Sequence, residues 1–227
     1  MKRFYKSAAV KRAGDGFGVT LDDRPVKTPS GAPLVLATAA LAQAIAAEWA
    51  GQGDTVDRRS MPLTGLANTA LDHGTAERAA ILKQLGAFAG HDLVCYRASE
   101  PPELVAREAR AWDAPLQWAR SRYGLDLQVT LGTLSVPQPG ASALEPALSR
   151  FDEFRLTGLL AAAGILKSVV LALSLADGRL DAASAHAAGH VDALFQAEKW
   201  GRDSEAEARL KALLKELEDA ERFMRLT

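Results

Sequence analysis

The sequence LTGLLAAAGILKSVVLALSL, residues 156–175, decides how the rest of this chain must fold. It is nearly all apolar and about as long as the ~20 residues that cross a bilayer as a helix. Lys167 lies in its middle, where a cation costs roughly 2.5–3.5 kcal/mol in a membrane. Gly158 and Gly164 weaken the membrane signal further. The stretch therefore predicts a buried central helix, with a membrane span as the weaker alternative.

The composition is typical of a globular protein that folds without metals or disulfides. Of the 227 residues, 48% are hydrophobic and 24% are charged, which are ordinary values. The net charge of −1 gives no reason to expect nucleic acid or an anionic membrane as a partner. Cys95 is the single cysteine, which excludes an intramolecular disulfide. The basic residues 1–6 precede no apolar segment, so neither a secretory signal nor a transit peptide is expected.

The first 60 residues predict a small β-rich domain. Apolar residues alternate in short runs over residues 5–26, separated by the turns Gly14-Asp15-Gly16 and Asp22-Asp23. The glycines at 14, 16 and 18 are interpreted as turn residues, because no helix pattern follows them as a phosphate-binding loop requires. Thr38 is expected to cap a helix that ends near Ala50. A meander with one packed helix is an α+β arrangement.

Residues 61–227 predict a larger, all-helical domain. Helices are expected over 63–70, 75–89 and 102–123, the last interrupted at Asp113-Ala114-Pro115 because proline suits a first turn and not an interior. One strand at 125–131 and a linker at 137–140 follow. Asp181 is expected to cap a helix that continues to Trp200, and an amphipathic helix closes the bundle from Ser204. The fold class is therefore α+β, with domains 1–60 and 61–227.

No catalytic residue, metal ligand set or cofactor site is predicted. Cys95 could be a nucleophile if His73 or His91 approached it, but a lone cysteine with apolar neighbours is more often a core residue. His186 and His190 could share a metal across one helical turn, but the motif of zinc proteases is absent. An uncharacterised enzyme that uses Cys95 or a metal at His186 and His190 is the alternative hypothesis.

The stretch from Asp181 to Gly201 carries the better candidates for a binding surface. Asp192 and Glu198 are six residues apart, which does not suit a catalytic carboxylate pair and leaves either one free to meet a cation on a partner. Trp49 and Trp200 each lie near a predicted helix end, where tryptophan is a frequent interface anchor. These four residues form the predicted partner-binding site.

Ten short segments, spread over nearly the whole length, resemble the Atp12 family of F1-ATPase (ATP synthase) assembly chaperones. In order, they are RFYK (3–6), LDDRPVKTP (21–29), AEW (47–49), MPLT (61–64), ANTALD (67–72), DLVCYRA (92–98), WD (112–113), VPQP (136–139), SVVLAL (168–173) and EKWG (198–201). No segment is diagnostic alone, but their order and spacing are specific to this family.

The resemblance implies a β-containing N-terminal domain, a helical C-terminal domain and a chaperone without ATPase activity. It implies binding of the unassembled α subunit of F1-ATPase, in the cytoplasm of a bacterium or in the mitochondrial matrix of a eukaryote; the missing transit peptide favours a bacterial protein. The family's sensitive positions match Trp49 and acidic residues before Trp200. Relatives carry an acidic run where this chain has Ala193-Leu194, and Asp-Pro where it has Asp113-Ala114, so Asp192 and Glu198 remain the acidic candidates.

Overall fold

The computed structural model describes residues 1–73, 77–132, 136, 138, 141–201 and 203–227, without the side chains of residues 141–143. The expected helix start at Thr75 and most of the expected linker at 137–140 lie outside these residues. The chain forms two compact units. Unit 1 contains residues 1–78, 152–158 and 222–227, and unit 2 contains residues 79–151 and 159–221. The division at residue 60 stays a prediction, since these units are discontinuous in sequence.

Unit 1 is built on a four-stranded antiparallel sheet. Strands β1 (Ala8–Ala13) and β2 (Gly16–Leu21) form a hairpin, and β2 also pairs with β3 (Arg24–Pro25) and β4 (Val35–Leu36). Gly16 is required at its position, because a Cβ atom there would lie 2.6 Å from the Leu36 carbonyl oxygen. The β-rich start predicted from alternation is thus confirmed, and the glycines at 16 and 18 lie within β2.

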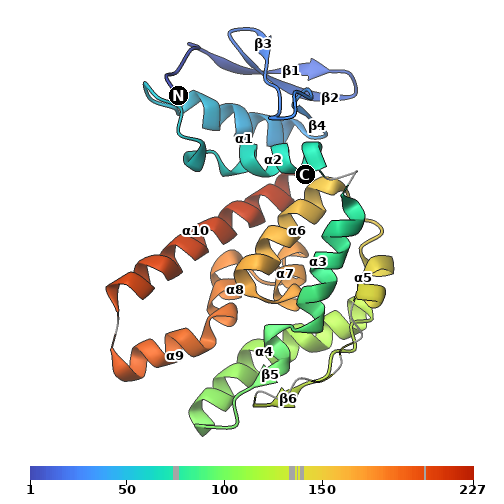
Figure 1. The fold of residues 1–227 in the computed structure, drawn as a ribbon, viewed down its shortest axis with the longest axis vertical. Coiled ribbons are helices and arrows are strands. Elements are labelled where there is room, and N and C mark those ends of the chain that lie inside the picture. Colours follow the sequence, from blue (N-terminus) through green and yellow to red (C-terminus); the bar gives the residue numbers. More distant parts are fainter. Residues whose placement is uncertain (74–76, 133–135, 137, 139–140, 202) are drawn as a thin grey trace. The chain divides into compact units, whose positions relative to one another are not determined.

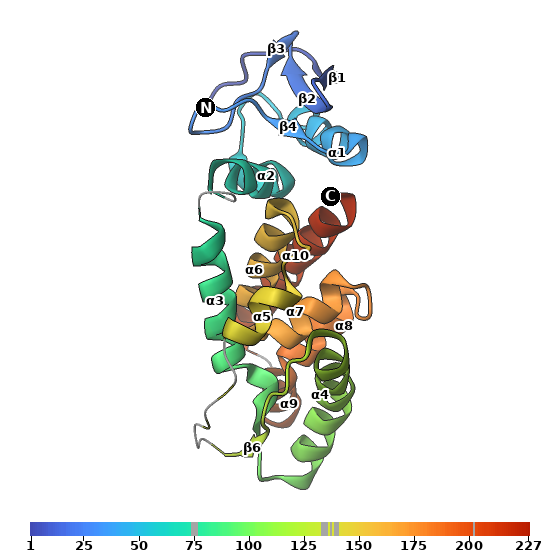
Figure 2. The ribbon, with the colours of Figure 1, turned by 90° about the vertical axis from the view of Figure 1, so that its right-hand side faces the viewer.

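Helix α1 (Ala39–Ala50) packs on this sheet (Figure 2) and begins as predicted, with the Thr38 side chain accepting from the Leu41 N–H. The helix α2 (Pro62–His73) follows a 3₁₀ turn, η1 (Arg58–Ser60). Glu48 of α1 caps α2, because its carboxylate accepts from the N–H groups of Leu63 and Thr64, both at 2.8 Å. This contact fixes the two helices to each other.

Unit 2 is mostly helical. Its elements are α3 (Arg78–Gly90), η2 (Leu93–Cys95), β5 (Tyr96–Arg97), α4 (Pro102–Tyr123), β6 (Thr130–Leu131), α5 (Ala141–Ala147), α6 (Glu153–Leu166), α7 (Val169–Ala176), α8 (Ala182–Gly189), α9 (Val191–Trp200) and α10 (Ser204–Leu226). The first turns of α6 and the last turn of α10 belong to unit 1. The strands β5 and β6 pair in parallel, so the part expected to be all-helical contains one small sheet. The predicted fold class is confirmed.

The apolar stretch 156–175 forms two helices and not the single central helix expected. The chain breaks after α6 at Lys167, which has φ 53°, and Ser168 then caps α7. All of Val169–Leu175 is buried, so the prediction of a buried element holds for the second half. In the described part of the chain, no helix is both long and apolar enough to span a membrane.

A buried carboxylate explains this break. Asp92 is fully buried and accepts from the N–H groups of Val94, at 3.2 Å, and Val170, at 3.1 Å. The Leu93 N–H donates to the Lys167 carbonyl oxygen at 3.0 Å. The segment 92–95 therefore satisfies backbone groups at the end of α6 and the start of α7, which a continuous helix would have bonded internally.

The expected break in α4 does not occur. Pro115 lies inside a continuous helix, although an interior proline costs about 3 kcal/mol. Packing on both sides of the proline offsets this cost. Trp112 is buried and donates from Nε1 to the Ala188 carbonyl oxygen at 2.7 Å, and the Tyr123 hydroxyl donates to Asp177 at 2.9 Å.

The helix expected from Asp181 to Trp200 is likewise two helices. Asp181 caps α8 as predicted, accepting from the Ser184 N–H at 2.7 Å, but the chain turns at His190 before α9. Gly189 permits the turn to press against α6, since a Cβ atom there would lie 2.9 Å from a methyl group of Leu166. Because of this turn, α9 does not continue along the axis of α8.

Asp92 makes the free energy of unfolding decrease as the pH rises, which is opposite to the effect of a carboxyl group whose pKa is lowered by folding. Burial raises its pKa from 3.8 to about 6, so the folded protein holds this proton more tightly than the unfolded chain does. The contribution is fully present below about pH 4 and is lost as the pH rises to about 6. The loss is about 3 kcal/mol. Between pH 4 and pH 7, Asp92→Asn should therefore gain about this much unfolding free energy relative to the wild type, measured with urea.

The exposed turn residue Asp15 provides the control, since Asp15→Asn should keep the wild-type pH dependence. Parallel stability profiles for Asp92→Asn and the wild type would contradict this role of Asp92.

Candidate functional site

A groove of about 1040 Å³ lies in unit 2, lined by residues of α6, α8, α9 and α10. Its walls are mainly apolar and include Ile165, Leu194, Ala197, Leu210, Leu213 and Leu214. The three leucines of α10 are half-buried, whereas Leu217 further along the same helix is fully buried. Figure 1 shows α9 and α10 diverging from the segment that joins them. One apolar face of α10 is therefore left partly open to solvent.

Helix α9 is held in place through its other apolar face. Val191 and Phe195 are buried, and α9 packs against α4 and α8. The Arg107 guanidinium lies 5.1 Å from the centre of the Phe195 ring and Lys199 lies 5.4 Å from it, which are cation–π distances. Packing on this side leaves Leu194 and Ala197 for the groove.

Glu198, a predicted site residue, belongs to a chain of charges between α9 and α4. Its carboxylate lies 2.7 Å from Arg107, which also contacts Glu103 at 3.1 Å, and Lys199 reaches Glu103 at 2.7 Å. The hydrogen bond from Arg107 lowers the pKa of Glu198, and the one from Lys199 lowers the pKa of Glu103. Both carboxylates are exposed, so these pairs orient side chains more than they stabilise the fold.

Asp192, the second acidic candidate, also lies against α4. It is exposed in the first turn of α9 and lies near Glu108, which is buried. Burial raises the pKa of Glu108, and the charge of Asp192 raises it further. Glu108 also accepts from the Ala98 N–H at 2.8 Å. Although six residues separate Asp192 and Glu198, both carboxylates reach α4.

Trp200 is exposed to the extent expected of an interface anchor. It ends α9 and is 77% exposed, the largest fraction among the large hydrophobic residues that are described as exposed. Gly201 follows with φ 95°, a conformation that favours glycine and turns the chain away after the tryptophan. Tryptophan is enriched at interfaces, because most of its indole is apolar and its N–H can still form a hydrogen bond.

Trp49 is packed within unit 1 and is only partly exposed. Its ring meets the Tyr5 ring edge to face, with centroids 5.6 Å apart, and its carbonyl oxygen accepts from the Tyr5 hydroxyl at 2.7 Å. The Nε1 atom is buried and has no acceptor among the described residues. Trp49 thus fixes the N-terminal segment to the end of α1.

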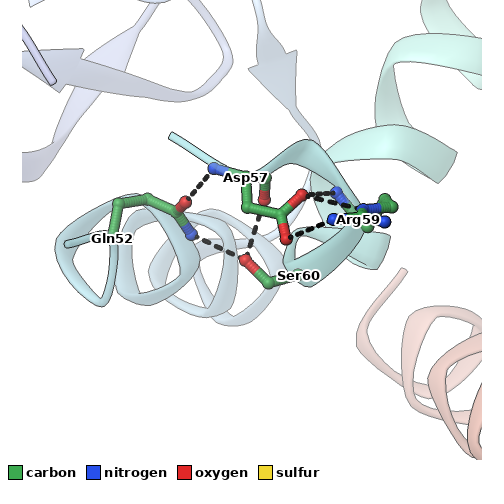
Figure 3. Close-up of polar contacts among 4 residues, drawn as sticks. All are labelled: Gln52, Asp57, Arg59 and Ser60. Atoms are coloured by element: carbon green, nitrogen blue, oxygen red, sulfur yellow. Dashed lines mark hydrogen bonds and ion pairs between the residues drawn. The ribbon is translucent and has the colours of Figure 1, made fainter. Parts of the chain in front are cut away.

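A polar cluster just after Trp49 holds the same region (Figure 3). The buried Gln52 side chain donates to Ser60 at 3.0 Å and accepts from the Asp57 N–H at 2.8 Å. Asp57 accepts in turn from the Arg59 N–H at 3.1 Å. The cluster therefore closes the loop between α1 and η1, just after Trp49.

The candidate enzyme residues have surroundings that do not favour catalysis. Cys95 is buried, and burial raises the pKa of its thiol to about 12, so the reactive thiolate is not formed near neutral pH. The rings of His186 and His190 stack with centroids 4.3 Å apart, and burial lowers the pKa of His186. In the ranges that the structure describes, no cluster of three potential ligands could hold a metal.

Sequence reasoning missed the groove and the α4 partners Arg107 and Glu108. The spacing of Leu210, Leu213 and Leu214 indicates an apolar face, but nothing in it shows that the face stays partly uncovered. The residues of α4 lie about ninety positions away in sequence, so only the fold brings them to α9.

Comparison with known proteins identifies the family. Residues 2–120, more than half of the chain, match the model of the ATP12 chaperone protein family. The crystal structure of Atp12 from Paracoccus denitrificans superimposes with a TM-score of 0.93 at 39% identity, covering 100% of this chain and 98% of that one. An aspartate-to-lysine variant of the same protein gives a TM-score of 0.93 at 39% identity, covering 99% and 97%.

A curated relative is the mitochondrial protein atp12 of Schizosaccharomyces pombe, 23% identical over 214 residues, which are 88% of this chain and 74% of the relative. The fold class and the resemblance found in the sequence agree with these matches. The chain belongs to the Atp12 family of chaperones.

The two tryptophans should differ in their effect on stability. Trp49→Ala removes a packed, half-buried ring and should lower the free energy of unfolding by roughly 2–3 kcal/mol, less than the roughly 3–5 kcal/mol expected for a core tryptophan, whereas Trp200→Ala should change it by less than about 0.5 kcal/mol. Urea unfolding of both variants measures the difference. Equal losses would show that the end of α9 is also part of the folded core.

Proposed function

We propose that this chain binds the unassembled α subunit of F1-ATPase and keeps it from aggregating until it pairs with the β subunit. The observation that carries the proposal is the relation to Paracoccus denitrificans Atp12, which covers 100% of this chain and 98% of that one at 39% identity. A chaperone function follows from the family, and assembly of ATP synthase is the process in which the family acts. The choice of α over β rests on the resemblance of the sequence segments.

The physical need for such a chaperone is clear. A subunit without its partner exposes an apolar interface, and exposed apolar surface leads to aggregation. A chaperone that covers this surface reversibly prevents aggregation without catalysis. We therefore propose that the chain acts as a binding protein, in the cytoplasm if it is bacterial and in the mitochondrial matrix if it is eukaryotic.

The end of α9 is the proposed contact surface. Trp200 supplies an exposed aromatic anchor, and Glu198 and Asp192 supply carboxylates on the same helix. Glu198 can exchange Arg107 for a cation of the client, because the existing pair is exposed to solvent and weak. Such an exchange would fix the position of the client along α9 at little cost in free energy.

Trp49 has a different part in the proposal. It is packed against Tyr5, so substitutions at Trp49 act on client binding through the shape of unit 1. Trp49→Phe is the better variant for testing contact, because it retains an aromatic ring against Tyr5. Its effect on client binding should be smaller than that of Trp200→Ala.

A light-scattering assay with purified F1 α tests the proposal. The wild-type chain should suppress aggregation of α and leave aggregation of β unchanged. Trp200→Ala should raise the chaperone concentration needed for half-suppression at least tenfold, as expected when an anchor residue is lost. Phe4→Ala removes another exposed aromatic residue, 64% exposed, and should change that concentration less than twofold.

Equal suppression by Trp200→Ala and the wild type would exclude the end of α9 as the contact. Failure of the wild type to suppress aggregation of α would contradict the proposed function itself.

A further inference from the structure

We propose that the groove between α9 and α10 is the docking site for an amphipathic helix of the client that carries lysine or arginine beside its apolar face. This inference rests on the proposed function, since the client is the subunit that the chaperone protects. The partner expected in the groove is a helix with one apolar face and basic residues beside that face.

The size and lining of the groove fit a helix. At about 1040 Å³, it is slightly larger than the roughly 300–1,000 Å³ found for small-molecule sites. Leucines at 210, 213 and 214 follow a three-and-four spacing on α10, and Leu194 and Ala197 face them from α9. Apolar side chains on two diverging helices are the surface into which a third amphipathic helix inserts its own apolar face.

The charged residues that line the groove indicate which residues should flank the apolar face of the client helix. Among the described lining residues, five carboxylates, Glu198, Asp203, Glu205, Glu207 and Glu216, stand against three cations, Lys167, Arg209 and Lys211. Four of the carboxylates fall between the last turn of α9 and the first turn of α10. Two of these already meet cations, since Glu198 contacts Arg107 of α4 at 2.7 Å and Glu207 contacts Lys211 at 3.1 Å. Asp203 and Glu205 are exposed at the same end and add to its negative charge. A basic residue is therefore the complementary group at the α9–α10 end.

The groove is also continuous with the proposed contact surface. Glu198 lines the groove and lies two residues before the exposed Trp200. A helix that extends from the groove beyond Glu198 would therefore approach the tryptophan, which lies outside the groove lining. There the indole could cover the alkyl stem of a lysine or arginine and face its cationic head.

A model peptide tests the groove without the client. The probe is a fluorescent, fourteen-residue amphipathic peptide of leucine and lysine, and its counterpart has glutamate in place of lysine. Fluorescence anisotropy should show one leucine–lysine peptide bound per wild-type chain, and the glutamate counterpart should bind at least tenfold more weakly.

Variants locate the binding. Ala197→Trp fills the groove from α9, and Leu213→Lys places a cation in it from α10; each should weaken peptide binding at least tenfold. Leu131→Lys alters an exposed leucine elsewhere in unit 2, 64% exposed, and should change binding less than twofold. Circular dichroism confirms folding, and if one groove variant fails to fold, the other decides the result.

Three outcomes would overturn the inference. The first is peptide binding that Ala197→Trp and Leu213→Lys leave unchanged, and the second is equal affinity for the two peptides. The third is a dimer in solution that Ala197→Trp dissociates, which would assign the groove to a second copy of this chain.

The aggregation assay separates this inference from the proposed function. If both groove variants protect α as well as the wild type does, the groove is not the client's docking site and the proposed function stands. If the wild type does not protect α, the proposed function fails, and the peptide measurements still decide whether the groove binds a basic amphipathic helix.

Discussion

The buried carboxylate of Asp92 is the interaction on which unit 2 depends. It accepts hydrogen bonds from the segment that follows it and from the start of α7, and so fixes the point at which the apolar stretch 156–175 changes direction. Residues Val169–Leu175 of α7 then lie buried, and α7 packs against α4 and α8. The turn at His190 places α9 against α4, and α10 diverges from α9. The groove and the exposed Trp200 follow from this sequence of turns, since one continuous helix from Asp181 would have carried Trp200 elsewhere.

Local sequence signals predicted much of the fold. They failed where contacts between residues far apart in the sequence determine the structure. The start of α1 at Thr38 and of α8 at Asp181 could be predicted, because a capping side chain and its N–H partner lie within three residues. The break at Lys167 could not, because apolar residues continue across it and Asp92, which satisfies the broken ends, lies some 75 positions earlier in the sequence. At Pro115 the error was the opposite one, because a break was predicted where the helix is continuous. The cost of the proline is local, whereas the packing of Trp112 and Tyr123 that offsets it comes from α8 and the end of α7.

In the candidate site, too, local sequence indicated some features and missed those that depend on distant contacts. Trp200 was predicted at an exposed helix end and lies there, whereas Trp49, chosen for a similar position in sequence, packs on Tyr5. The six-residue spacing of Asp192 and Glu198 gave no reason to expect a shared neighbour, yet both lie against α4. In the proposed function, these pairings matter because a client would compete with Arg107 for Glu198. Weak, exposed ion pairs suit a chaperone, since the client has to be released to its permanent partner.

The central claim is that the end of α9 contacts the α subunit of F1-ATPase. A photoreactive amino acid placed at position 200, and for comparison at position 131 on the same unit, tests it most directly. After irradiation with a mixture of unassembled α and β, mass spectrometry identifies the crosslinked chain. The account predicts crosslinks from position 200 to α, few from position 131 and none to β. Crosslinks to α from position 131 alone, or equal crosslinks to α and β from position 200, would contradict it.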